Sequence, residues 1–494
     1  MKELTFAAAT ELAPLIESRQ LSPVELTEQL LNRIHQLDST IESYITPLPE
    51  LALADARKAE RDIMQGLYKG PMHGIPVGIK DNFYTEGIRT TVGSKLFSDF
   101  IPGKTAASVK KLLDAGGIML GKLNMHELAA GSTGTNPFFG TQKNPWNINY
   151  MPGGSSGGSS AALAAGLATL ATGTDTFGSI RLPAAMCGIY GLKVTYGLVS
   201  TDGIFPTAPS LDTAGPMARS VPDLALMLQY MAGYDQNDSA SLKVPVPNYM
   251  ENLSRGIQGL KIGIPTYYME GLDPDVEILF NHAVEMLEYL GAEVKEMKIP
   301  ELTMSAFSGN TIVTSEAANT HYEWLQTRPE DYSADIRTFF LAGTLLNPPK
   351  YIRAQQARRK MVKAFDKAFQ NVDILLGPTI PITTPAYAEN WVEQNLEVVI
   401  RCMPYTVPIN LTGVPSLSVP IGLCSKGLPV GMQFIGKHLS EKLLLQAGNE
   451  WENTNPLALR SELYPHFRMP LLPQSVPPIK PYFLQSPLKH QLLL

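Results

Sequence analysis

The sequence predicts an α/β protein in which helices alternate with short, mostly apolar strands. Three short runs, residues 74–79, 117–121 and 259–265, have strand-like composition, and each begins with glycine. The segments between such runs carry helical spacing, as residues 105–115 do. Alternation of this kind is typical of an α/β domain with a largely buried sheet.

The chain is organised around a glycine-serine turn that runs directly into an alanine-rich helix, residues 150–166. Glycine permits unusual backbone dihedral angles and close approach to a ligand, and the run Ala161–Ala165 favours a helix. A second polar turn, residues 173–181, follows after one apolar segment. We therefore expect the serines of the two turns to converge in space.

Three other interpretations of the first turn compete with a catalytic one. A flexible Gly/Ser linker fits the composition, but structure-forming sequence abuts both sides. A phosphate-binding loop requires lysine where this chain has Ser159. A purely structural tight turn also fits, but a serine-based active site is the interpretation we favour.

Composition limits the classes of protein and partner. The 494 residues are 44% hydrophobic and 17% charged, as in a globular protein with a large core. The formal net charge of −6 argues against nucleic-acid binding. Three widely spaced cysteines show no metal-ligand spacing and suit a reducing compartment. No run of 18 apolar residues or signal-peptide pattern is present, so we expect no membrane span and a cytoplasmic location.

The remaining elements follow in chain order. Residues 5–35 predict helices, one of them with Ser22 as N-cap and Pro23 at its first position. Further helices are expected at 276–290 and over most of 301–370, and strands at 187–194, 197–200, 292–297, 372–378, 415–420 and 431–436. We expect the strands after 370 to rejoin the sheet begun before 200, which makes one domain.

Acyl transfer requires a nucleophile, a base and donors for the oxyanion. No histidine lies in either turn, and His126 is the nearest alternative base. Lys80 is the stronger candidate, because it ends an apolar strand where burial would lower its pKa. Either Ser155 or Ser179 could attack, and the residues alone do not rank them.

Many motifs, in order, resemble the amidase signature family. They are the stretches at 74–82, 121–125, 143–146, 153–159, 173–176, 178–181, 183–188, 191–200, 210–217, 413–420 and 428–433. The resemblance covers about residues 5–450. It implies a single large domain over residues 1–460, with a central mixed β-sheet covered by helices. The motif core is expected at about 74–216, a variable helical region at about 300–370, and a proline-rich tail at 461–494.

The resemblance also implies a Ser–cis-Ser–Lys triad. Ser179 would be the acylated nucleophile, Lys80 the base, and Ser155, after a cis peptide bond, the bridge between them. The expected oxyanion and substrate-binding residues, followed by the structural supports, are Thr176, Phe177, Gly178, Met125 and Gly131, and then Ser156, Asp175 and Arg181. No metal or other cofactor is implied.

Position 177 departs from the family pattern, which usually has glycine there. A left-handed backbone at this position would be strained with phenylalanine. The ring of Phe177 could instead narrow the acyl pocket in favour of small or slender substrates, or simply pack in the core.

The expected function is hydrolysis of a C–N amide-type bond in a small molecule by a stand-alone amidase, through an acyl-enzyme. Two alternatives use the same triad: hydrolysis of carbamates or urea derivatives, and the glutaminase subunit of a tRNA-dependent amidotransferase, which needs a partner protein. A binding protein without catalysis is a third, from another class. A homodimer is the assembly considered.

Overall fold

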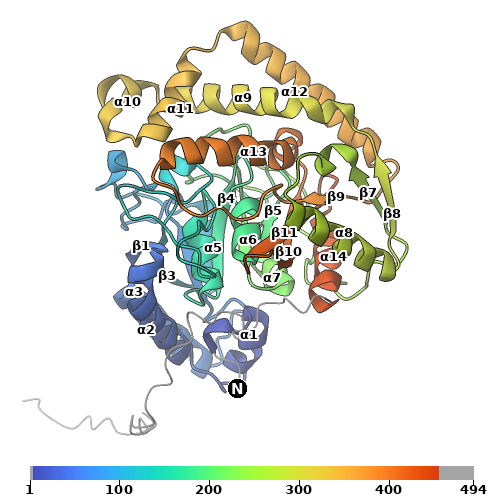
Figure 1. Cartoon of the computed structure of the whole chain (residues 1–494). Helices are drawn as coiled ribbons and strands as arrows, with labels where there is room; N and C mark the ends of the chain where they lie inside the picture. Colours follow the sequence, from blue (N-terminus) through green and yellow to red (C-terminus); the bar gives the residue numbers. More distant parts are fainter. Residues whose placement is uncertain (1–3, 455–494) are drawn as a thin grey trace, which may run out of the picture.

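An 11-stranded mixed β-sheet crosses the molecule, and the computed structural model describes residues 4–454 (Figure 1). In sheet order the strands are β1 (Tyr44–Pro47), β3 (Ile118–Leu123), β2 (Pro76–Lys80), β4 (Leu170–Asp175), β6 (Thr213–Ala218), β5 (Tyr190–Lys193), β10 (Ser416–Leu423), β11 (Pro429–Gly436), β9 (Ile374–Pro378), β7 (Lys261–Pro265) and β8 (Glu293–Met297). β2 is parallel to β3 and β4, whereas β4 is antiparallel to β6. The predicted α/β class with a central mixed sheet is confirmed.

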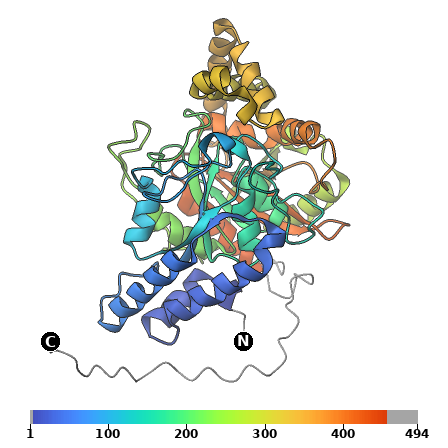
Figure 2. The same cartoon turned by 90° about the vertical axis from the view of Figure 1, so that its left-hand side faces the viewer.

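Helices surround this sheet. They are α1 (Ala9–Glu17), α2 (Pro23–Ile41), α3 (Pro49–Met64), α4 (Ala107–Asp114), α5 (Gly157–Ala164), α6 (Arg181–Cys187), α7 (Val221–Met231), α8 (Pro274–Tyr289), α9 (Ser305–Thr320), α10 (Tyr322–Thr327), α11 (Ala334–Thr344), α12 (Pro348–Ala368), α13 (Trp391–Thr412) and α14 (Glu441–Thr454). Figures 1 and 2 place α9–α12 at one end of the molecule and α1–α3 at the opposite end. The expected helical character of 301–370 is confirmed.

Helix α2 begins as its sequence predicts. The Ser22 hydroxyl accepts hydrogen bonds from the backbone N–H groups of Val24 and Glu25, and Pro23 occupies the first turn. Both features satisfy or remove donors that an open helix start would leave unpaired.

The two halves of the sheet meet where β5 pairs with β10. Lys193 lies opposite Ser416 in this antiparallel ladder. The strands after residue 370 therefore rejoin the sheet begun before residue 200, as expected. Strands β2, β3, β4, β5 and β6 are buried along their whole length, which places the core along the sheet near the two serine turns.

Two predicted strands differ from the structure. The segment 187–194 is only partly extended, because Cys187 ends α6 and Gly188 closes the helix in the left-handed conformation at φ 67°. Residues 197–200 form no strand and contribute only an isolated bridge between Val199 and Ala232.

Helix α13 was not expected from the sequence. It contains Pro404 and Pro408, each of which removes a helical hydrogen-bond donor. It ends at Gly413 in the left-handed conformation. None of the helices described between residues 4 and 454 is long and apolar enough to cross a membrane. The proline-rich segment 461–494 lies outside the described residues, and the domain boundary at 460 stays a prediction.

Candidate active site

The site forms where two neighbouring parallel strands end. Lys80 is the last residue of β2, and Asp175 is the last residue of β4. Parallel strands deliver their carboxyl ends to the same edge of a sheet, and loops at that edge commonly form ligand sites. The loop after β4, residues 176–180, therefore lies close to the side chain of Lys80.

The Lys80 amino group is fully buried among hydroxyl groups. Its Nζ lies 2.9 Å from Ser155 Oγ, 2.8 Å from Ser156 Oγ and 2.7 Å from Thr174 Oγ1. Burial lowers the pKa of Lys80 to about 7, against the opposing influence of Asp175 and Asp212. A large fraction of neutral amine is therefore present near neutral pH, as a general base requires.

The two serine turns lie against each other, as expected. The peptide bond between Gly154 and Ser155 is cis. The Ser155 carbonyl accepts the N–H of His126, and the Ser156 N–H donates to the Ser179 carbonyl at 3.3 Å. Ser155 thus lies between Lys80 on one side and the turn that carries Ser179 on the other.

Ser179 is 7% exposed and lies in the wall of a cavity. Among residues 4–454 its hydroxyl forms no hydrogen bond, with Ser155 or any other group. The structure joins Lys80 to Ser155 directly and leaves Ser179 Oγ open to the cavity. Catalytic hydrogen bonds are often long without substrate, so this geometry is compatible with a relay.

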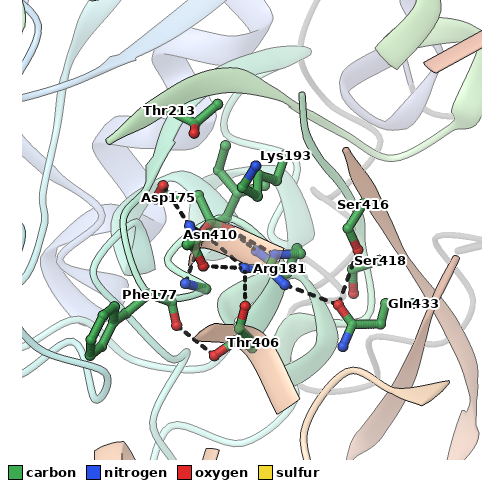
Figure 3. Close-up of polar contacts among 12 residues, drawn as sticks. Asp175, Phe177, Arg181, Lys193, Thr213, Thr406, Asn410, Ser416, Ser418 and Gln433 are labelled. Atoms are coloured by element: carbon green, nitrogen blue, oxygen red, sulfur yellow. Dashed lines mark hydrogen bonds and ion pairs between the residues drawn. The ribbon is translucent and has the colours of Figure 1, made fainter. Parts of the chain in front are cut away.

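The carboxylate of Asp175 organises the loop that precedes Ser179 (Figure 3). It accepts the backbone N–H of Gly178 at 2.8 Å and that of Ile180 at 3.2 Å, and it pairs with Arg181 at 3.0 Å. Burial alone would raise the pKa of Asp175, but the Arg181 guanidinium outweighs it and holds that pKa well below its usual range. A fixed negative charge therefore anchors the loop.

One of the four backbone groups expected to bind an oxyanion is already engaged, since the Gly178 N–H donates to Asp175. Within the described part of the chain, the N–H groups of Phe177 and Ser179 have no protein acceptor. The left-handed angle falls on Gly178, at φ 112°, while Phe177 is not among the positive-φ residues. The backbone strain considered for phenylalanine at 177 is therefore absent.

The cavity beside Ser179 has a volume of about 450 Å³ and is walled by α9, α11, α13 and the loops at 129–132 and 176–179. Most of its lining is apolar: Ala129, Ala130, Gly131, Phe177, Ala306, Val313, Phe339, Ala342, Val392, Leu396, Val399, Ile400 and Met403. Asp335 and Glu393 are its acidic residues, and no lysine or arginine is found among the described residues that line it. The cavity suits an uncharged, largely apolar ligand.

The structure separates the two expected substrate contacts outside the serine turns. Gly131 lines the cavity, whereas Met125 is fully buried in an apolar cluster and is not part of the lining. The ring of His126 packs against Gly131 and pairs with Asp335 at 3.0 Å between Nε2 and Oδ2. His126 therefore has a structural partner away from Lys80.

Several polar residues at the site were missed by the sequence argument. Thr174 contacts Lys80, and Thr406, Asn410 and Gln433 surround Arg181 (Figure 3). The last three come from β11 and a helix that was not recognised, more than 220 residues away in the chain. The described residues hold no group of three or more His, Cys, Asp or Glu side chains that could bind a metal ion.

Comparison with known proteins places this geometry in context. Residues 25–445 match the model of the Amidase family. Over 482 residues the chain is 40% identical to a Methylococcus capsulatus protein whose name makes it one of the subunits of glutamyl-tRNA(Gln) amidotransferase, with 91% of this chain and 98% of that protein covered.

Two solved structures resemble the fold closely. One belongs to a vestigial protein complex described as revealing the evolutionary origins of an s-triazine catabolic enzyme. It has a TM-score of 0.86 at 32% identity and covers 91% of this chain and 98% of its own. The other is a bacterial aryl acylamidase of the amidase signature family, with a TM-score of 0.83 at 27% identity and coverage of 94% and 98%.

Proposed function

The chain belongs to the amidase signature family and is an amide-hydrolysing enzyme, and from this premise we propose that it acts through an acyl-enzyme at Ser179. The observation that carries the proposal is the 2.9 Å contact between Lys80 Nζ and Ser155 Oγ, beside a nucleophile that opens onto a cavity. Ser179 supplies the attacking oxygen, Ser155 relays its proton, and Lys80 receives it.

The proposed first half-reaction forms the ester and releases the amine. Ser179 Oγ adds to the amide carbon while its proton passes to Ser155 and the Ser155 proton passes to neutral Lys80. The oxyanion is stabilised by backbone N–H groups at Phe177 and Ser179. As the C–N bond breaks, Lys80 returns its proton through Ser155 to the departing nitrogen, which leaves as ammonia or an amine.

The second half-reaction uses water. A water molecule adds to the ester carbon and loses its proton through Ser155 to Lys80. The C–O bond to Ser179 then breaks, and the proton returns to Ser179 Oγ by the same route. The products are a carboxylic acid and the free enzyme, so no other reactant is needed.

The apolar cavity favours substrates with an uncharged alkyl or aryl group next to the amide. A glutamine substrate carries an α-carboxylate, and the described lining offers no lysine or arginine to pair with it. Burying an unpaired charge is costly, which argues for an apolar amide as the preferred substrate. The substrate is therefore a small-molecule amide, and a homodimer stays a prediction.

The glutaminase subunit of a tRNA-dependent amidotransferase is the second candidate. It is favoured by the 40% identity to the Methylococcus capsulatus protein over nearly its whole length. In that case glutamine would be cleaved at Ser179 and the ammonia passed to a partner protein. The same nucleophile would form a carbamoyl-enzyme from a carbamate, but no comparison favours that reaction.

One assay separates these candidates. The purified chain is offered an aryl amide, an aliphatic amide, a carbamate and glutamine, with Ser179→Ala as the control for each. Turnover of apolar amides well above that of glutamine supports the stand-alone amidase. Hydrolysis of glutamine alone, or only after a partner protein is added, would favour the amidotransferase role instead.

A further inference from the structure

Helix α13 presents one continuous face to both the cavity and the serine loop. Residues spaced three or four apart lie on the same side of a helix. On α13 such a stripe comprises Val392, Leu396, Val399, Met403, Thr406 and Asn410. The first four line the cavity, and the last two form hydrogen bonds to the loop after β4.

Thr406 holds one end of a single peptide group. Its Oγ1 donates to the carbonyl oxygen of Phe177 at 2.6 Å. Its side chain also packs directly on Gly178, where an added Cβ would lie 2.7 Å from the Cβ and Cγ2 atoms of Thr406. This contact and the φ of 112° together require glycine at position 178.

Asp175 holds the other end of the same peptide group. Its Oδ1 accepts the Gly178 N–H at 2.8 Å, and the same oxygen accepts Asn410 Nδ2 at 2.8 Å. The peptide that joins Phe177 to Gly178 is therefore gripped at its carbonyl by Thr406 and at its N–H by Asp175.

We propose that Thr406 is a positioning residue for the oxyanion-binding loop. Its grip on the Phe177 carbonyl turns the Gly178 N–H away toward Asp175 and leaves the N–H groups of Phe177 and Ser179 for the substrate oxygen. This inference rests on the proposed acyl-enzyme function. Because Met403 lies one helical turn before Thr406, the wall that contacts the substrate and the residue that orients the loop belong to one rigid face.

The test compares variants that differ in the hydroxyl group. Thr406→Val replaces it with a methyl group of similar size, and Thr406→Ser retains it. With an apolar amide, kcat should fall about 10- to 100-fold in Thr406→Val while KM changes little, because loss of alignment acts on the transition state. Thr406→Ser should keep kcat within a few fold of the parent enzyme, and labelling of Ser179 by a fluorophosphonate should slow in parallel with kcat.

Thr412→Val is the matched control. Thr412 is also buried on α13, and its Oγ1 donates to the carbonyl of Pro408 without contact to the loop. Should Thr406→Val fold poorly, Thr406→Ala and Thr406→Ser form a second pair that differs only by the hydroxyl. A lower melting temperature without a change in kcat, or equal loss in the Ser and Ala variants, would overturn the positioning role.

The acyl-enzyme and the role of Thr406 fail in different ways. If the parent enzyme turns over amides but a fluorophosphonate never labels Ser179, the proposed acyl-enzyme is wrong. If Ser179 is labelled normally in the parent enzyme and equally fast in Thr406→Val, only the role of Thr406 is wrong.

Discussion

Lys80 and Ser155 are joined by a 2.9 Å contact in a region from which both side chains are fully withdrawn from solvent. No carboxylate lies within ion-pair distance of this lysine in the described chain, unlike buried Lys122, which pairs with Asp81 at 3.2 Å. A lysine without a counter-ion in a dry site gives up its proton easily. The pair has the arrangement expected of a base and its relay.

Replacing Ser179 by alanine should abolish turnover and leave the fold intact, since one oxygen is lost at a site that lines a cavity. Activity on an apolar amide and the near-ultraviolet circular dichroism spectrum would measure the two effects. In the parent enzyme a fluorophosphonate should modify Ser179, as located by mass spectrometry. Modification at another residue would exclude Ser179 as the nucleophile.

The pH dependence should report on Lys80. Because the neutral amine is the active form and burial lowers its pKa to about 7, kcat/KM should rise with pH through about 7 and then level off. Lys80→Arg stays protonated and should be inactive at every pH. Lys193 provides the control, since burial also lowers its pKa to about 7 and it contacts only the carbonyls of Val194 and Val414. Lys193→Met should retain the rising limb, and its disappearance there would assign the limb to Lys193.

Phe177→Gly should widen the acyl side of the cavity. The ring lines the cavity and its edge would meet a Cβ on Gly309 at 3.3 Å, so it fills space between substrate and α9. We expect kcat/KM for bulky acyl groups to gain about tenfold over small ones, or about 1.4 kcal/mol. The buried Phe340, outside the lining, gives the matched control Phe340→Leu, which should lower stability without altering the ranking. An unchanged ranking in folded Phe177→Gly would reduce the ring to packing.

Arg181→Met should destabilise the protein strongly. Its guanidinium pairs with Asp175 and also donates to Thr406, Asn410 and Gln433. Removing it leaves a buried carboxylate unpaired, which costs about 3–5 kcal/mol in the free energy of unfolding. Urea denaturation at neutral pH would measure this, and adding Asp175→Asn should recover part of the loss. If the double variant were less stable than Arg181→Met alone, the charge pair would not be the cause.

Leu396→Asp should raise KM for apolar amides. Leu396 lines the cavity and is 58% exposed, so it forms part of the entrance on α13. A charge at this position removes apolar contact with the substrate while it remains solvated, so kcat should change much less than KM. Tyr289→Asp on α8, which is 85% exposed and outside the lining, provides the surface control. Equal effects of both changes would remove the entrance role.

Local sequence was sufficient for the parts of the site that local sequence builds. Lys80 follows from an apolar strand that ends in lysine, and the serine turns follow from glycine-rich stretches on either side of one helix and strand. Their contact was anticipated because only one short segment separates them.

Contacts across the chain were beyond the reach of these patterns. Thr406 and Asn410 lie on a helix whose spacing was obscured by Pro404 and Pro408, and their partners are 225 or more residues away. The occupied N–H of Gly178 was equally hidden, because it depends on where the Asp175 carboxylate points. Assignment of the left-handed angle to Gly178 instead of position 177 required the backbone itself.

The pairing of β5 with β10 bears on how such a chain could be divided or recombined. A cut in the connection between α7 and β7 would leave each fragment with an open sheet edge that only the other fragment matches. The amino-terminal piece would hold Lys80, Ser155 and Ser179 but would lack Thr406 and Gln433 around Arg181. Exchange of halves between related chains would therefore have to preserve both the seam and these contacts, so the signature motifs are not a portable module.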